Sequence, residues 1–95
     1  MARYYFHTEG AHRFHDETGH EFADENQVAA EALGFLAESL RGAQDSFWES
    51  PAYRVVVTDA DGLILYVLDL SGVEASGIKS RRMAALEETA RSSEG

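Results

Sequence analysis

The chain has 95 residues, of which 17 are acidic and 8 are basic, so its formal net charge is −9. This length fits a single domain, and the negative charge disfavours generic binding to nucleic acid or anionic lipid. The chain contains no cysteine, which excludes disulfides and thiolate catalysis and favours a reducing cytoplasm. The N-terminus has no signal-peptide core, and the longest apolar run, at 63–68, is too short to span a membrane. We therefore expect a cytoplasmic protein without a membrane span.

An aromatic-rich segment at residues 3–8 predicts the first strand. Side chains alternate between the two faces of a strand, so Tyr4, Phe6 and Thr8 share one face. A turn at Glu9-Gly10 is expected to lead into a short second strand from His12 to Asp16, centred on Phe14. Phe22 is then expected to cover the core before a helix begins.

The helix over residues 24–41 is marked at both ends. Asp24 is placed as the N-cap with Gln27 three residues on, which is a capping box. Arg41 suits the last turn, and Gly42 suits the left-handed position that ends helices. Gly34 falls on the polar side, and nothing in the sequence explains it. The apolar arc of this helix is predicted to contain Val28, Ala29, Ala32, Leu33, Leu36 and Leu40.

Two apolar runs joined by Asp59-Ala60-Asp61-Gly62 predict a β-hairpin over residues 53–70. A two-residue turn at Asp61-Gly62 would place Arg54 opposite Asp69 and Val57 opposite Tyr66. A type I turn with Gly62 in a bulge would instead place Arg54 opposite Leu68 and Val57 opposite Leu65. We favour the bulged register, because Asp at the first turn position bonds its own backbone and Gly fits the left-handed site.

The segment after Gly72 predicts a helix that begins at Ser80 or its neighbours and runs through Ala90, with a narrow apolar stripe. Its beginning is basic, which opposes the helix dipole and suggests that these charges meet an acidic surface elsewhere. A helix of this length is marginal alone and needs to dock on its own domain or on another subunit. We expect residues 1–72 to form one α+β domain and residues 73–95 a C-terminal helical extension with a flexible end.

Several short motifs occur in a recognisable order: Arg3-Tyr4-Tyr5-Phe6-His7, Asp16 with Gly19, Glu21, Phe22 and Asp24, Glu31-Ala32, and the valine strand that runs into Asp59-Ala60-Asp61-Gly62-Leu63. Over residues 3–70 the chain resembles a family of small uncharacterised bacterial proteins, common in α-proteobacteria, that is known as a domain of unknown function. In that family an aromatic residue, often tryptophan, directly precedes the valine strand, whereas here Tyr53 holds that place. The resemblance implies a β-β-α-β-β domain and no particular activity.

Histidines supply the candidate ligands. His12, His15 and His20, with Asp16 and Glu17 nearby, form the densest group of possible metal ligands. Residues 12 and 15 point to opposite faces of a regular strand, so a solvated polar edge competes with this interpretation. His7 could act as a buried general base, but we favour a structural histidine, because no nucleophile motif accompanies it. A small-molecule site would require a polar pocket near His7 or His15.

The sequence thus predicts an α+β fold with an antiparallel sheet of three to four strands, one amphipathic helix on one face, and a C-terminal helix. Because both faces of the hairpin are apolar, one helix leaves the second face uncovered. We expect a non-enzymatic module without cofactors that forms a homodimer or binds a protein partner through the open sheet face or a sheet edge. A nucleic-acid-associated or antitoxin-like regulator is the competing class, and a metal or small-molecule binder is a third. The candidate interaction residues are Val56, Leu65, Val67, Met83 and Leu86.

Overall fold

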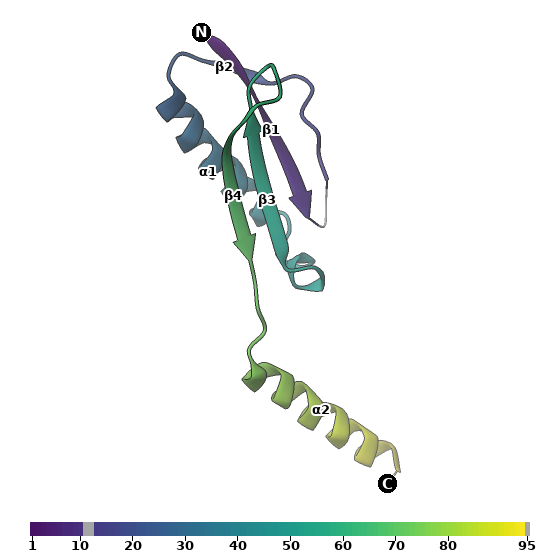
Figure 1. The fold of residues 1–95 in the computed structure, drawn as a ribbon. Coiled ribbons are helices and arrows are strands. Elements are labelled where there is room, and N and C mark those ends of the chain that lie inside the picture. The colour runs from purple at the N-terminus through teal and green to yellow at the C-terminus, as the bar shows by residue number, and fades with distance from the viewer. Residues whose placement is uncertain (11–12, 95) are drawn as a thin grey trace.

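The structure is a computed structural model that describes residues 1–10 and 13–94. The elements along the chain are β1 (Ala2–Gly10), β2 (His20–Phe22), α1 (Glu25–Arg41), the 3-10 turn η1 (Phe47–Glu49), β3 (Ala52–Thr58), β4 (Ile64–Ser71) and α2 (Ser76–Glu94). The four strands form one antiparallel sheet in the order β2-β1-β3-β4. Helix α1 lies across one face of the sheet, and α2 projects beyond the end of β4 (Figure 1). The predicted α+β class and element order are confirmed.

The core lies between α1 and the three longer strands. The alternation predicted for β1 is confirmed, because Tyr4, Phe6 and Thr8 are all buried. They meet alternate residues of β3 and one face of α1, so a single apolar layer holds the helix on the sheet. The buried apolar residues are Tyr4, Phe6, Val28, Ala32, Tyr53, Val55 and Val57.

The second strand does not lie where the sequence suggested. Residues 13–19 form a loop that pairs with β1 through an isolated bridge between Thr8 and Phe14, and β2 begins at His20. Two features of the loop produce this shift. The Asp16 carboxylate binds backbone N–H groups of the loop, and Gly19 adopts a φ of 69°. A Cβ atom at Gly19 would lie 2.8 Å from the carbonyl oxygen of Tyr4, so only glycine lets the chain turn back so close to β1.

Helix α1 begins and ends as its capping residues indicate, with two corrections. The Asp24 carboxylate accepts a hydrogen bond from the Asn26 N–H, and the helix runs through Arg41. Gly42 is not left-handed, since its φ is −83° and its N–H bonds to the carbonyl of Leu40. Leu33 was placed on the apolar arc but is 59% exposed. Phe35 packs against the core beside Leu36 and Leu40, which rotates the buried face away from Leu33.

The hairpin combines features of both predicted registers. The turn at 59–62 is the one that we favoured: the Asp59 carboxylate accepts from the Asp61 and Leu63 N–H groups, and Gly62 has a φ of 84°. Beyond the turn, a bulge between Val57 and Thr58 shifts the pairing. Arg54 therefore lies opposite Asp69 and Val57 opposite Tyr66, and the favoured ladder is wrong for most of its length. The turn could be predicted because its hydrogen bonds involve neighbouring residues. The bulge between Val57 and Thr58 could not be predicted from the sequence.

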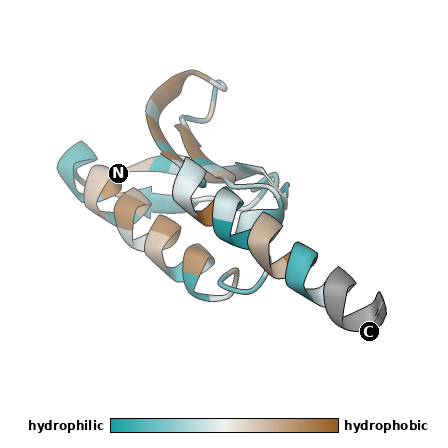
Figure 2. Ribbon diagram, turned by 90° about the horizontal axis from the view of Figure 1, so that it is seen from below, coloured by the Kyte–Doolittle hydropathy of each residue, from teal (hydrophilic) through white to brown (hydrophobic). Residues whose placement is uncertain are grey.

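Helix α2 is longer than predicted. It begins four residues before Ser80 and continues to Glu94. All of its described side chains, from 76 to 89, are exposed. Figure 2 shows hydrophobic and hydrophilic residues mixed along it, in contrast to the hydrophobic band on α1. No helix among the described residues is long and apolar enough to cross a membrane.

Candidate functional site

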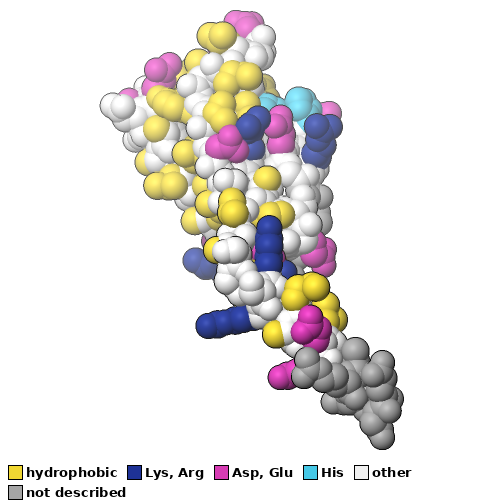
Figure 3. Space-filling model, turned by 60° about the horizontal axis from the view of Figure 1, so that its bottom comes forward, with side chains coloured by type: hydrophobic (Ala, Val, Ile, Leu, Met, Phe, Trp, Pro, Cys, Tyr) yellow, Lys and Arg dark blue, Asp and Glu magenta, His cyan; other side chains and the backbone are white. Residues whose placement is uncertain are grey.

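The side of the sheet opposite α1 is the principal candidate surface. Three rows of paired residues cross β1, β3 and β4 on this side: Tyr5–Thr58–Ile64, His7–Val56–Val67 and Glu9–Arg54–Asp69. We call these nine residues the open face. Its outer apolar groups are accessible, since Ile64 is 59% and Val67 49% exposed. Charged and histidine side chains also gather on the body, beside the apolar groups (Figure 3). The face is therefore mixed in character, and more polar than the apolar hairpin runs suggested.

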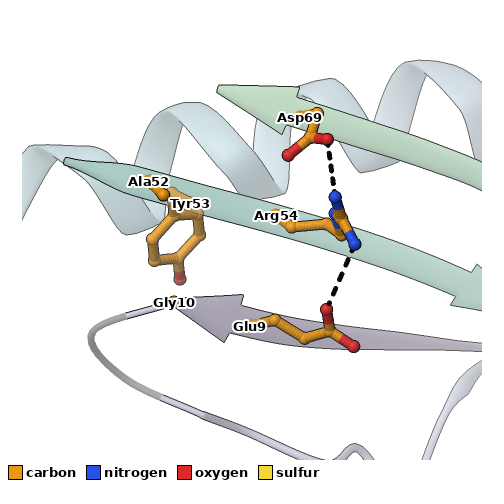
Figure 4. Close-up of a pocket in the computed structure, with 6 residues that line it drawn as sticks. All are labelled: Glu9, Gly10, Ala52, Tyr53, Arg54 and Asp69. Atoms are coloured by element: carbon orange, nitrogen blue, oxygen red, sulfur yellow. Dashed lines mark hydrogen bonds and ion pairs between the residues drawn. The ribbon is translucent and has the colours of Figure 1, made fainter. Parts of the chain in front are cut away.

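The row nearest the end of β4 is an ion-pair network. The Arg54 guanidinium donates to the Asp69 carboxylate over 2.8 Å and lies 3.7 Å from a carboxylate oxygen of Glu9 (Figure 4). The hydrogen bond from Arg54 lowers the pKa of Asp69, and the same bond raises the pKa of Arg54. All three side chains are exposed, so solvent screens these ion pairs and the network adds little to stability. Its main effect is to place two carboxylates around one cation.

His7, in the next row, uses both ring nitrogens. Its Nδ1 accepts a hydrogen bond from the Asp16 N–H at 3.1 Å, so the neutral ring carries its proton on Nε2. That Nε2–H donates to the Thr58 hydroxyl at 3.0 Å. Burial lowers the pKa of His7, and the nearby His15 adds to this effect. His7 is thus a neutral histidine that ties β1 to β3 and to the 13–19 loop.

Three rings lie parallel above this part of the sheet. His15 stacks on His7 with ring centroids 4.5 Å apart and planes inclined by 17°. The Tyr5 ring is nearly parallel to that of His7, and their centroids are 6.5 Å apart. The two imidazoles therefore face each other with their flat surfaces rather than pointing nitrogen atoms at one point. Stacked rings of this kind can contact a flat ligand. Their nitrogen atoms do not converge as the ligands of a metal ion do.

Asp16 fixes the loop that carries His15. Its carboxylate accepts from the N–H groups of Phe6, Thr18 and Gly19 at 3.0–3.1 Å. Burial alone would raise the pKa of Asp16, but the N–H donors of Gly19, Phe6 and Thr18 outweigh it, so the pKa lies below its usual value. The Phe6 N–H lies on β1 just beyond the point where pairing with β2 ends. Asp16 thus takes the place of a strand partner there.

Between the ring stack and the hairpin turn lies an open depression of about 570 Å³. Four of the described residues that line it are carboxylates and none is a lysine or arginine, so it is an acidic surface. It can attract a cationic group, although the carboxylates of Glu9, Asp16 and Asp59 already contact donors within the protein. Its lining residues are Tyr5, His7, Glu9, His15, Asp16, Glu17, Val56, Thr58, Asp59, Ala60, Gly62 and Ile64.

Comparison with protein-family models matches residues 3–71 to a domain of unknown function, DUF6894. The chain belongs to the DUF6894 family. The DUF6894 domain includes all four strands and α1, whereas α2 lies outside the matched region. No curated protein and no solved structure matches the chain. This match confirms that the chain belongs to a family of unknown function, as the resemblance in the sequence indicated.

Several residues that carried the resemblance lie around the 13–19 loop of the DUF6894 domain. The Arg3 guanidinium donates to the Thr18 carbonyl at 2.6 Å and lies 3.5 Å from the Glu21 carboxylate. Asp16 binds the N–H groups described above, and Gly19 makes the close turn. In this chain these residues hold the loop against β1, so they explain the fold rather than a reaction.

The histidines proposed as ligands are only partly described. His12 lies outside the described residues. His15 is exposed and stacks on His7, whereas His20 is in β2 with its ring 6.5 Å from that of Phe6. Within residues 1–10 and 13–94, no group of three or more His, Asp or Glu side chains is placed to hold a metal ion. Metal binding by these histidines stays a prediction.

The proposed interaction residues divide into three groups. Val56 and Val67 lie on the open face, and Met83 and Leu86 are exposed on α2. Leu65 differs from both, because the strand pairing shifts next to it and its side chain is partly buried and packs against the core. Sequence reasoning missed Ile64 and Arg54 as members of the face. Ile64 could have been found only with the correct register, since the apolar run itself does not show which residues point outward.

Proposed function

We propose that this protein is a non-enzymatic interaction module that associates with a second copy of itself through the open face and the adjoining edge of β4. The observation that carries this proposal is the combination of exposed apolar residues, Ile64 and Val67, with a terminal strand. Strand β4 is eight residues long, and no described strand pairs with its outer edge. An exposed strand edge offers a row of unpaired N–H and C=O groups to another chain.

A second copy is a suitable partner because it supplies the same edge in return. Antiparallel pairing of two β4 edges about a twofold axis would make an isologous contact, the commonest form of homodimer interface. It would extend the four-stranded sheet without changing either core. The exposed apolar groups of the open face lie next to this edge and would lose solvent contact at the same time.

The test is the mass of the protein in solution as a function of concentration, measured by sedimentation equilibrium. We expect reversible dimer formation by the native chain and a shift toward monomer for Val67→Lys. The control is Leu33→Lys, which introduces the same charge at an apolar residue of similar exposure on α1, 59% against 49% for Val67. A native chain that stays monomeric at high micromolar concentration would refute the proposal and leave a foreign protein as the occupant. Equal dimerisation by both variants would also refute it.

A further inference from the structure

We infer that the segment of the second copy that covers the open face is helix α2, held there by its own apolar and basic residues. This inference rests on the self-association proposed above and identifies the contact. The two structural elements involved are each incomplete alone. Helix α2 has no buried side chain among its described residues, and the described part of the 13–19 loop contacts the open face at His7 while Ile64 and Val67 stay exposed. A helix exposed on all sides is marginally stable in water and gains stability by packing.

Helix α2 has one face suited to such packing. At 100° per residue, the exposed residues Ile78, Met83 and Leu86 fall within an arc of about 140°, with Leu86 near its centre. Lys79 and Arg82 lie within the same arc. The helix is about 28 Å long at 1.5 Å per residue, which is comparable to the length of β4. The mixed apolar and basic arc matches the mixed apolar and acidic open face.

Charge favours this pairing. Residues 1–72 contain 13 acidic and 4 basic residues and so carry the whole net charge of −9, whereas residues 73–95 contain 4 of each. From Ala75 to Leu86 the only charged residues are Lys79, Arg81 and Arg82. Figure 3 shows Lys and Arg side chains around the part of α2 nearest the body. The acidic depression and the basic beginning of α2 are therefore complementary, and their contact would offset part of the repulsion between two bodies of charge −9.

The path of the chain favours a second copy over the helix's own domain. The Gly72 N–H donates to the Pro51 carbonyl, so the chain is fixed to the body up to that residue. Only Val73 to Ala75 then link it to α2. Within this link, the Glu74 carboxylate accepts a hydrogen bond from Arg82, which joins the linker to the second turn of the helix. The helix leaves in the direction of β4, away from its own sheet (Figure 1). Folding back onto its own sheet would require the chain to reverse within these three residues.

Reciprocal exchange follows from a twofold axis. Each α2 would cross to the open face of the other copy, so one dimer would contain two identical contacts. Each contact would remove the apolar arc of one helix and the exposed apolar groups of one face from water. The cysteine-free sequence makes this geometry directly testable by disulfide cross-linking.

The experiment mixes two single-cysteine variants of the full chain, Val67→Cys and Leu86→Cys, that carry different tags, and oxidises them under mild conditions. The inference expects a Val67→Cys/Leu86→Cys heterodimer as the main cross-linked product. The control pair replaces Leu86→Cys with Glu88→Cys, which lies on the opposite side of α2, and should give at least about 5-fold less product. Circular dichroism of each variant establishes that it is folded.

The outcomes separate this inference from the proposed function. A cross-link between two Val67→Cys chains, with none from Val67→Cys to Leu86→Cys, would mean that the open face is the interface but that α2 does not cover it. Equal yields with Leu86→Cys and Glu88→Cys would also overturn the inference. Monomeric protein without cross-links would overturn both proposals.

Charge reversal gives an independent measurement. Lys79→Glu, within the apolar arc, should raise the dimer dissociation constant by about 3- to 10-fold at low salt, and the effect should shrink in 0.5 M salt. Arg81→Glu is the matched control on the opposite side of the helix and should change the constant by less than about 2-fold. Equal effects of the two reversals would contradict a specific contact by this face of α2.

Discussion

Replacing Asp16 with alanine should destabilise the domain more than its position in a surface loop suggests. The carboxylate accepts three backbone N–H bonds, two of which, from Phe6 and Gly19, are partly buried, whereas the one from Thr18 is exposed. Water can replace the exposed bond at little cost. A hydrogen bond to a charged group contributes about 1.5–3 kcal/mol, and the lower end applies to these two bonds because they are only partly buried, so their loss should lower the free energy of unfolding by about 3 kcal/mol. That is a large part of the roughly 5–15 kcal/mol typical of a domain.

Urea unfolding followed by circular dichroism measures this loss, with Glu17→Ala, at the exposed neighbouring residue, as the control. The pH dependence adds a second criterion. The pKa of folded Asp16 lies below its usual value of 3.8, so its stabilisation is fully present above that pH and is lost as pH falls through the folded pKa. The difference between native protein and Asp16→Ala should therefore be largest near neutral pH and shrink in acid. A loss at pH 7 equal to that of Glu17→Ala would refute the role assigned to these hydrogen bonds.

Three further substitutions test other features by the same unfolding measurement. Gly34→Ala should stabilise the protein by about 0.5–1 kcal/mol, because the helix interior there is open and no atom lies within 4 Å of an added Cβ; a loss of stability would contradict this. Val57→Ala should cost about 1.5–3 kcal/mol, because the side chain is fully buried between α1 and the sheet. Since the pKa of folded His7 is lowered, its contribution is present above the unfolded pKa near 6.5 and is lost as pH falls through the folded value. Native stability should thus decrease on acidification below about pH 6.5, and His7→Gln should reduce that slope without abolishing folding.

The parts of the fold that sequence predicted correctly are those decided by neighbouring residues. The capping carboxylate of Asp24 fixes where α1 begins, and alternation along residues 3–8 fixes which side of β1 is buried. The Asp59 side chain and Gly62 specify the hairpin turn, because their hydrogen bonds and φ angle lie within four residues. Gly34, unexplained by sequence, remains without a structural reason, since open space surrounds it.

The errors arose where distant residues decide the outcome. Phe14 lies in an apolar-polar pattern that resembles a strand, but Asp16 bonds the N–H of Phe6, ten residues earlier, and so holds the chain in a loop. The bulge beside Thr58 shifts the pairing of β3 with β4, and no turn residue indicates it. The existence of the open face was predicted correctly, because both sides of the hairpin are apolar. Its polar half was not, because the bond between His7 and Thr58 joins residues 51 positions apart.

The Asp16 loop has a consequence for how many molecules one assembly can hold. On the β1 side of the sheet, β2 pairs with residues 2–4, Asp16 binds the N–H of Phe6, and Phe14 exchanges two hydrogen bonds with Thr8. Among the described residues, β2 leaves an edge of three residues there, whereas β4 presents eight. Growth of a sheet into a fibre needs two usable edges on every molecule. In the dimer that we propose, pairing of the two β4 edges would use the long edge of each copy, so the Asp16 loop would oppose further growth of the sheet.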